Sequence, residues 1–295
     1  MKALINRERE TAGLEQVLKG AWGTIGPEFS GLIDRLGKPF GVKYGLATFS
    51  NTAALEAVLR GLDIGYGDEV LVSDYSLPMD ASVAVAVGAT PVFCDIAEKG
   101  LTPDRKSLAS NLTAKTKAVI VDVIAEDDCD IKDLSDFCRE KGLRFILNMG
   151  DAFCIGQEGE PIAKYADAAV LDMSEGTMWN VGYAGAVLTD RKELFDLFFS
   201  CHNCGRSFGE GCTLSFGEVI GGDLRIDEWQ ASLISLRLER LGELSEAEVG
   251  KGIEKSRCFV MHKQPFMKSA YYRTNTGSLR EYGDAEFPNI KKQGL

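Results

Sequence analysis

Short apolar segments alternate with amphipathic ones along most of this 295-residue chain, and this alternation constrains the fold more than any other feature. Apolar runs predict strands, and stretches whose apolar residues recur on one helical face predict helices. The expected strands are residues 43–50, 70–73, 90–96, 117–124, 143–149, 167–174 and 184–190. The expected helices are residues 51–62, 80–88, 130–142, 191–201 and a long one from about 227. Near-continuous apolar strands separated by helices are typical of a mostly parallel sheet with helices on both faces.

The carboxyl ends of the strands are the expected location of a ligand site, because open α/β sheets bind ligands there. Four polar segments follow expected strands, and they are SNT (50–52), SDYSLP (73–78), NMGDAF (148–153) and DMSEGT (172–177). Ser50, Asn51 and Thr52 are all residue types that cap helices. Taken alone, SNT is therefore better explained as an ordinary helix cap than as a phosphate site. Asp227 and Gln230 form an expected capping box at the start of the last long helix.

Bulk charge and hydropathy disfavour several classes of partner. The net charge is −11, and no cluster of five or more Lys and Arg residues is present, so nucleic acid is an unexpected partner. No apolar run reaches about 18 residues, which argues against a membrane span. The segment MKALINRERE lacks an apolar core, so we expect no signal peptide and a cytoplasmic location.

The eight cysteines are scattered, which is typical of reduced thiols rather than of a disulfide framework. One group is closer in sequence and consists of Cys201, Cys204 and Cys212. This group could hold zinc or an iron–sulfur cluster, with a fourth ligand from His202 or Cys154. Three independent thiols are the favoured interpretation, because a single CxxC without a second pair is a weak signal, and we expect no metal.

Several sequence blocks, taken in order, resemble a known family. The blocks are AWGTIGPEF (21–29), FSNTAALEAVLRGLDIGYGDEVLVSDYS (49–76), GATPVFCDI (88–96), GYAGAVLTD (182–190) and GGDLRIDEWQASLISLRLERL (221–241). Together they resemble the DegT/StrS-type sugar aminotransferases, which are fold-type I pyridoxal-phosphate (PLP) enzymes. The similarity covers roughly residues 10–255.

This resemblance implies a PLP-transferase-like large domain over residues 1–250, including the N-terminal segment. Residues 251–295 then correspond to a remnant of the C-terminal small domain, which typically exceeds 100 residues in the family. The family works as dimers with active sites at the subunit interface, and its substrates are typically nucleotide-linked keto-sugars. The resemblance therefore implies a homodimer, or a heterodimer with an active aminotransferase, and a nucleotide-sugar ligand.

The same resemblance shows what the cofactor site lacks. PLP needs a lysine for its Schiff base, a carboxylate at the pyridine nitrogen and donors for its phosphate. The lysine position falls on Thr177, which cannot form a Schiff base. The phosphate-side serine falls on Asp172, with Ser174 two residues later, and an unpaired carboxylate beside a phosphate is unfavourable. The ring-stacking aromatic falls on Leu77.

Other family positions are retained in part. Ser50, Asn51 and Thr52 fall on the phosphate loop, and Asp151 falls near the pyridine carboxylate, although a slip of one residue would place Gly150 there. Trp22 and Thr24 lie in the substrate-side loop. Arg225 matches a family arginine near the site, and an equally good interpretation pairs Arg225 with Asp227 or Glu228.

Three functional hypotheses remain open at this point. The first is a non-catalytic homologue, which would act as a partner subunit or bind a sugar nucleotide without turnover. The second is a lysine-independent enzyme, similar to dehydratase relatives, that binds PLP or pyridoxamine phosphate (PMP) non-covalently. The third is an active aminotransferase whose lysine comes from elsewhere, for instance Lys251, Lys255 or a partner chain.

Overall fold

The computed structural model describes residues 4–20, 25–125, 127, 129–153, 156–207, 219–244, 252–268 and 282–295. A seven-stranded sheet lies at its centre, in the order β1-β10-β9-β6-β5-β2-β4. Its strands are β1 (Tyr44–Thr48), β2 (Glu69–Ser73), β4 (Thr90–Cys94), β5 (Thr116–Asp122), β6 (Arg144–Asn148), β9 (Ala168–Asp172) and β10 (Gly185–Thr189). All strands are parallel except β10, which is antiparallel to both β1 and β9. The mostly parallel α/β fold predicted from the sequence is therefore confirmed.

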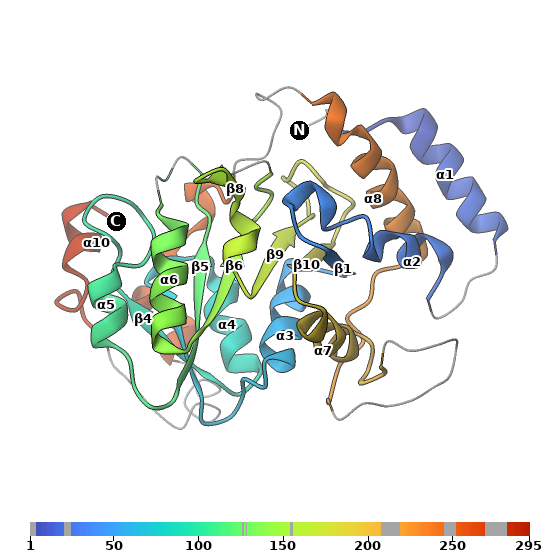
Figure 1. Ribbon diagram of the computed structural model, residues 1–295. Helices are drawn as coiled ribbons and strands as arrows, with labels where there is room; N and C mark the ends of the chain where they lie inside the picture. The colour runs from blue at the N-terminus through green and yellow to red at the C-terminus, as the bar shows by residue number, and fades with distance from the viewer. Residues whose placement is uncertain are drawn as a thin grey trace.

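Helices cover both faces of this sheet (Figure 1). The main helices are α3 (Asn51–Gly61), α4 (Pro78–Ala86), α5 (Arg105–Ser110), α6 (Ile131–Lys141) and α7 (Lys192–His202). The chain moves towards β4 through α3 and α4 and away from β4 through α5 and α6. Right-handed crossovers in opposite directions place their helices on opposite faces. Accordingly α3 packs against α4 and α7, whereas α6 covers the other face.

Three further helices extend the molecule at the β1 end. They are α1 (Arg7–Lys19), α2 (Pro27–Ile33) and α8 (Glu228–Arg240), and α1 and α8 lie side by side (Figure 1). Buried Arg237 of α8 pairs with Glu10 of α1 and donates to the carbonyl oxygens of Trp179 and Asn180. The predicted capping box of Asp227 opens α8. Sequence periodicity did not predict α1, in which Val17 is the buried residue, or α2, which spans only seven residues.

The chain beyond residue 251 packs onto the other end of the sheet. The strand β11 (Phe259–Val260) pairs with β3 (Tyr75–Ser76), and α10 (Pro288–Lys292) lies near β4. A second short pair joins β7 (Gly156–Gln157) to β8 (Glu160–Pro161). Single 3₁₀ turns are η1 (Lys38–Phe40), η2 (Ile162–Tyr165), η3 (Leu241–Glu243), η5 (Lys255–Arg257), η6 (Met261–Lys263) and η7 (Pro265–Lys268).

The core consists of the apolar strand residues and the inward faces of the helices. The largest fully buried side chain is Trp179, which packs near Phe40. Among the described residues, no helix is both long enough and apolar enough to cross a membrane.

Candidate active site

The carboxyl edge of the parallel strands brings together the polar segments that follow them. Ser50 comes after β1, Asp122 ends β5, Asn148 ends β6 and Asp172 ends β9. The loop between β9 and β10 returns to the same edge and carries Thr177. The strand order thus brings segments that lie far apart in the sequence to one edge of the sheet.

The SNT segment forms the start of α3. The Ser50 Oγ accepts a hydrogen bond from the Ala53 N–H at 3.0 Å, which is ordinary N-capping. Asn51 is buried and donates from Nδ2 to Asn148 Oδ1 at 3.1 Å, whereas Thr52 is exposed. The side chains of Ser50 and Asn51 therefore make their hydrogen bonds to other groups of the protein.

Two buried carboxyl groups lie behind the start of this helix. Asp80 Oδ1 accepts from Asn148 Nδ2 at 2.9 Å, and Asp122 Oδ2 accepts from the Leu77 N–H at 2.9 Å. Asp80 Oδ2 and Asp122 Oδ1 have no other hydrogen-bond partner among the described residues. The two carboxyls are close enough to hydrogen-bond to each other when one of them is protonated. Burial raises the pKa of Asp122 to about 6 and the pKa of Asp80 well above its usual value of 3.8.

Thr177 is buried inside the loop between β9 and β10. Its Oγ1 donates to the Ser174 carbonyl oxygen at 2.7 Å and accepts from the Asn180 N–H at 3.2 Å. Ser174 in turn donates from Oγ to Asp172 Oδ1 at 2.5 Å. The hydroxyl of Thr177 therefore stabilises the loop on which it lies.

Asp172 is paired, which corrects the sequence expectation of a lone carboxylate. Its Oδ2 lies 2.6 Å from the Arg257 guanidinium, and only 4% of the Asp172 side chain is exposed. Sequence analysis missed Arg257 because it lies 85 residues further along the chain, beyond the matching blocks. No local pattern around Arg257 signals this contact.

Residues 252–262, which we call the C-terminal strap, cross the carboxyl edge from β5 to β2. The Ile253 N–H donates to the Val123 carbonyl at 2.8 Å, and the Ala125 N–H donates to the Ile253 carbonyl at 2.8 Å. At the other end of the strap, His262 Nδ1 lies 2.6 Å from the buried Asp74 carboxylate. This strap supplies Arg257 and covers the strand ends where a ligand is expected.

Asp151 lies between the strap and the Thr177 loop. It accepts from the Met178 N–H at 3.1 Å and also from the Gly252 N–H. Burial raises its pKa, although these hydrogen bonds oppose the change. Leu77 is buried. The carboxylate of Asp151 therefore has backbone partners in the protein itself.

The remaining candidates fall into two groups. Arg225 forms a two-point ion pair with Asp223 at 2.7 and 2.9 Å, a partner that sequence analysis did not name. Asp223 is the nearer partner because residues 223 and 225 point to the same side of an extended segment. Trp22, Thr24, Cys212, Cys154 and Lys251 lie outside the described residues, and no prediction about them is tested.

The cysteine group is tested only in part. Cys201 is buried in α7, and burial raises its pKa to about 12, so it is a neutral thiol at pH 7. Within the described ranges, no three His, Cys, Asp or Glu side chains are placed to bind one metal ion.

Three of the residues that the resemblance assigns to the PLP site either lack an amine or have partners within the protein. Thr177 has no amine, Asp172 carries negative charge and is bound by Arg257, and Asp151 accepts backbone N–H groups. Lys255 is exposed on η5, and Lys164 pairs with Glu160. Two hollows, of about 550 and 450 Å³, are lined by other residues.

The sequence profile of the DegT/DnrJ/EryC1/StrS aminotransferase family matches residues 5–248. The chain belongs to this family. It is 28% identical over 243 residues to the L-glutamine:2-deoxy-scyllo-inosose aminotransferase of Streptomyces lividus, a match that covers 77% of this chain and 57% of that protein. It is 30% identical to the spore coat polysaccharide biosynthesis protein SpsC of Bacillus subtilis, which covers 65% of this chain and 49% of that protein.

The fold of the family is shared as well. An aminotransferase structure from Psychrobacter cryohalolentis superposes with a TM-score of 0.72 at 24% identity, covering 81% of this chain and 63% of the other. The chain spans about half to three fifths of the length of the two curated relatives named above. The assignment of Thr177 to the lysine position continues to rest on the sequence resemblance.

Proposed function

We propose that this chain is a DegT-family protein of amino-sugar or polysaccharide biosynthesis that does not catalyse PLP-dependent transamination. Thr177 carries the proposal, since it stands where the family has its Schiff-base lysine and since its hydroxyl is hydrogen-bonded inside the loop. A threonine hydroxyl cannot form the imine that links PLP to this family of enzymes.

The strap gives independent support. The phosphate of PLP would approach Asp172, which is negatively charged and already bound to Arg257. Displacing Arg257 would leave the Asp172 carboxylate buried without a cationic partner beside a second anion, which is strongly unfavourable. Ile253 is held by backbone hydrogen bonds beyond the end of β5. Cofactor binding would therefore require the strap to leave the carboxyl edge.

The proposed role is that of a non-catalytic partner subunit, either in a homodimer or in a heterodimer with an active aminotransferase. The relatives include a spore coat polysaccharide biosynthesis protein and an L-glutamine:2-deoxy-scyllo-inosose aminotransferase. A subunit without its own cofactor can still contribute a surface and site residues to a partner. A nucleotide-sugar is the small molecule that such a complex would bind.

Borohydride reduction in the presence of PLP tests the absence of Schiff-base chemistry. We expect no phosphopyridoxyl-lysine in the peptide mass spectrum and no aldimine absorbance, with an active family aminotransferase as the positive control. A labelled lysine, whether Lys255, Lys251 or another, would overturn the proposal in favour of an active enzyme.

Co-expression tests the partner role. We expect the tagged chain to co-purify with an active DegT-family aminotransferase from the same genome, or with an untagged copy of itself. A strictly monomeric protein that retains neither partner, and that binds no nucleotide-sugar in calorimetry, would contradict the subunit proposal.

A further inference from the structure

The larger of the two hollows lies at the edge of the sheet opposite the candidate active site. Its volume is about 550 Å³, and it is formed by the end of α6, the start of β6, the segment leading into β9 and the start of α7. Four cations line it together with one carboxylate. We call this the basic hollow, and its charged residues are Arg139, Arg144, Lys164, Arg191 and Asp167.

The one carboxylate of the basic hollow is fully engaged. Asp167 Oδ1 accepts from Arg144 at 3.1 Å and from Arg191 at 2.7 Å, and its Oδ2 accepts from the Phe145 N–H at 2.9 Å. A guanidinium has five N–H donors. Among the described residues, Arg144 uses one of these donors and Arg191 uses two, the second for Glu193. Both arginines therefore keep donors for another anion.

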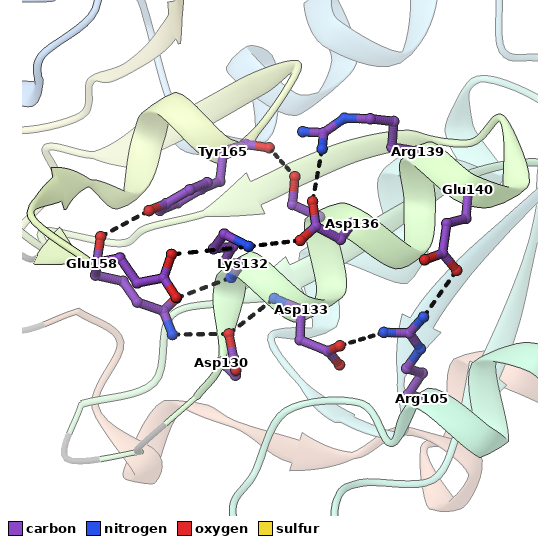
Figure 2. Close-up of polar contacts among 11 residues, drawn as sticks. Arg105, Asp130, Lys132, Asp133, Asp136, Arg139, Glu140, Glu158 and Tyr165 are labelled. Carbon is purple, nitrogen blue, oxygen red and sulfur yellow. Dashed lines mark hydrogen bonds and ion pairs between the residues drawn. The ribbon is translucent and has the colours of Figure 1, made fainter.

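The outer partners of these cations do not line the hollow. Arg139 pairs with Asp136 at 2.7 Å, as Figure 2 shows, and Lys164 pairs with Glu160 at 2.7 Å. These ion pairs are partly or largely exposed, and such pairs are weak and exchange readily. A more highly charged anion in the hollow can thus share or take over their cations.

The uncharged part of the lining adds no competing negative charge. Burial raises the pKa of Cys138 to about 12, so its thiol is neutral at pH 7. The Ser135 hydroxyl donates to the Tyr165 carbonyl at 2.6 Å. Four cations against one shared carboxylate are an unusual concentration in a chain of net charge −11.

We propose that the basic hollow binds a small molecule bearing phosphate groups, with Arg144 and Arg191 as its principal donors. Two guanidiniums converging on one point match the geometry in which arginine binds phosphate oxygens. The volume is within the range of small-molecule sites and exceeds what a single phosphate needs. This site is separate from the proposed function, because it lies at the amino ends of β6 and β9.

Titration calorimetry of the full chain with pyrophosphate at low ionic strength is the test. We expect saturable binding that weakens as salt is added. Arg144→Gln and Arg191→Gln should each weaken pyrophosphate binding by about tenfold or more, since each removes charge-assisted hydrogen bonds. Asp167→Asn should strengthen it severalfold, because it removes the carboxylate that competes for both arginines.

Arg105→Gln is the matched control. Arg105 also bridges two acids, Asp133 and Glu140 (Figure 2), but it is not one of the lining residues of the basic hollow. Its replacement should leave pyrophosphate binding unchanged. Lys164→Gln is a further test variant that does not disturb the ion pairs of Asp167, and it can be used if the variants around Asp167 fold poorly. It should weaken pyrophosphate binding severalfold.

The probes also distinguish the phosphate source. Inorganic phosphate, pyrophosphate and a nucleoside diphosphate should all bind, with the last two tighter, whereas succinate at equal ionic strength should bind much more weakly. No binding of millimolar pyrophosphate, equal binding of succinate, or an equal loss in Arg105→Gln would each overturn the proposal.

Discussion

Thr177 is the residue that the family resemblance assigns to the lysine position. It lies in the loop that connects β9 to β10 at the carboxyl edge, and its hydroxyl makes a hydrogen bond within that loop. The change at Asp172 is different in kind, because its charge needed a partner and Arg257 provides it. The predictions for single residues therefore concern which molecules or groups each side chain can bind and at which pH it ionises.

Restoring the lysine alone should not restore cofactor binding. We expect Thr177→Lys to give no aldimine absorbance with PLP, because Asp172, Arg257 and the strap remain in place. A lysine in this buried position should also lower the free energy of unfolding by about 1–3 kcal/mol through overpacking. Spectrophotometric titration with PLP and urea unfolding measure the two effects. Strong aldimine absorbance would mean that the strap does not block the site.

The Asp80–Asp122 pair should make stability depend on pH. The pKa of Asp122 is raised from 3.8 to about 6, so the folded protein holds this proton more tightly than the unfolded chain. The resulting stabilisation is complete below about pH 4 and is lost as pH rises through about 6. Asp122→Asn removes it, so the variant should gain on the order of 2 kcal/mol relative to the wild type between about pH 4 and pH 8.

Urea unfolding of both proteins across this pH range measures the effect. Asp136→Asn is a suitable control, since Asp136 is partly exposed and its pKa is lowered by Lys132. Parallel stability curves for wild type and Asp122→Asn would show that the pKa of Asp122 is not raised in the folded protein.

At the scale of elements, the strap lies outside the part of the chain that the family profile matches. It begins after the last residue that the family profile covers, and it is held by backbone pairing with β5 and β3 and by two side-chain pairs. It contains only short 3₁₀ turns and a two-residue strand, so no periodicity in the sequence predicted where it would lie. Only contacts with distant strands define its path.

The Arg257–Asp172 pair should contribute measurably to holding the strap. Arg257→Gln should lower the free energy of unfolding by about 1–3 kcal/mol, because it leaves the Asp172 charge buried. The double variant Arg257→Gln/Asp172→Asn should recover much of that loss. Lys255→Gln, two residues earlier and exposed, should have little effect. Equal losses in the single and double variants would contradict a direct ion pair.

At the scale of the whole molecule, the described part of the chain beyond residue 251 packs on the sheet of the large domain. His262 links Asp74, which follows β2, to Asp284, and its ring stacks on Phe287 at 4.6 Å. Asn289 and Ile290 donate backbone N–H groups to Asp95 beyond β4. These contacts suggest one cooperative unit, although residues 251–295 were predicted as a remnant of a separate domain.

Calorimetry should therefore record a single unfolding transition. His262→Ala should lower its midpoint and reduce the free energy of unfolding by about 2–4 kcal/mol, since Asp74 loses its side-chain partner in a buried position. Lys263→Ala, the neighbouring residue on the surface, should change it by less than about 0.5 kcal/mol. A separate early transition abolished by His262→Ala would instead indicate an independent C-terminal unit.

Local sequence patterns predicted the mostly parallel sheet and the succession of strands and helices along the chain, and the family resemblance assigned Thr177 to the lysine position. These follow from local patterns, because apolar strands, helix caps such as Ser50 and the family blocks are each written in contiguous residues. Only the tertiary structure shows that Asp172 is paired with Arg257, that Asp80 and Asp122 lie close together, and that the strap crosses the strand ends. Each of these findings depends on contacts between segments that lie tens to hundreds of residues apart. No local sequence pattern records which charged side chains are buried at such contacts.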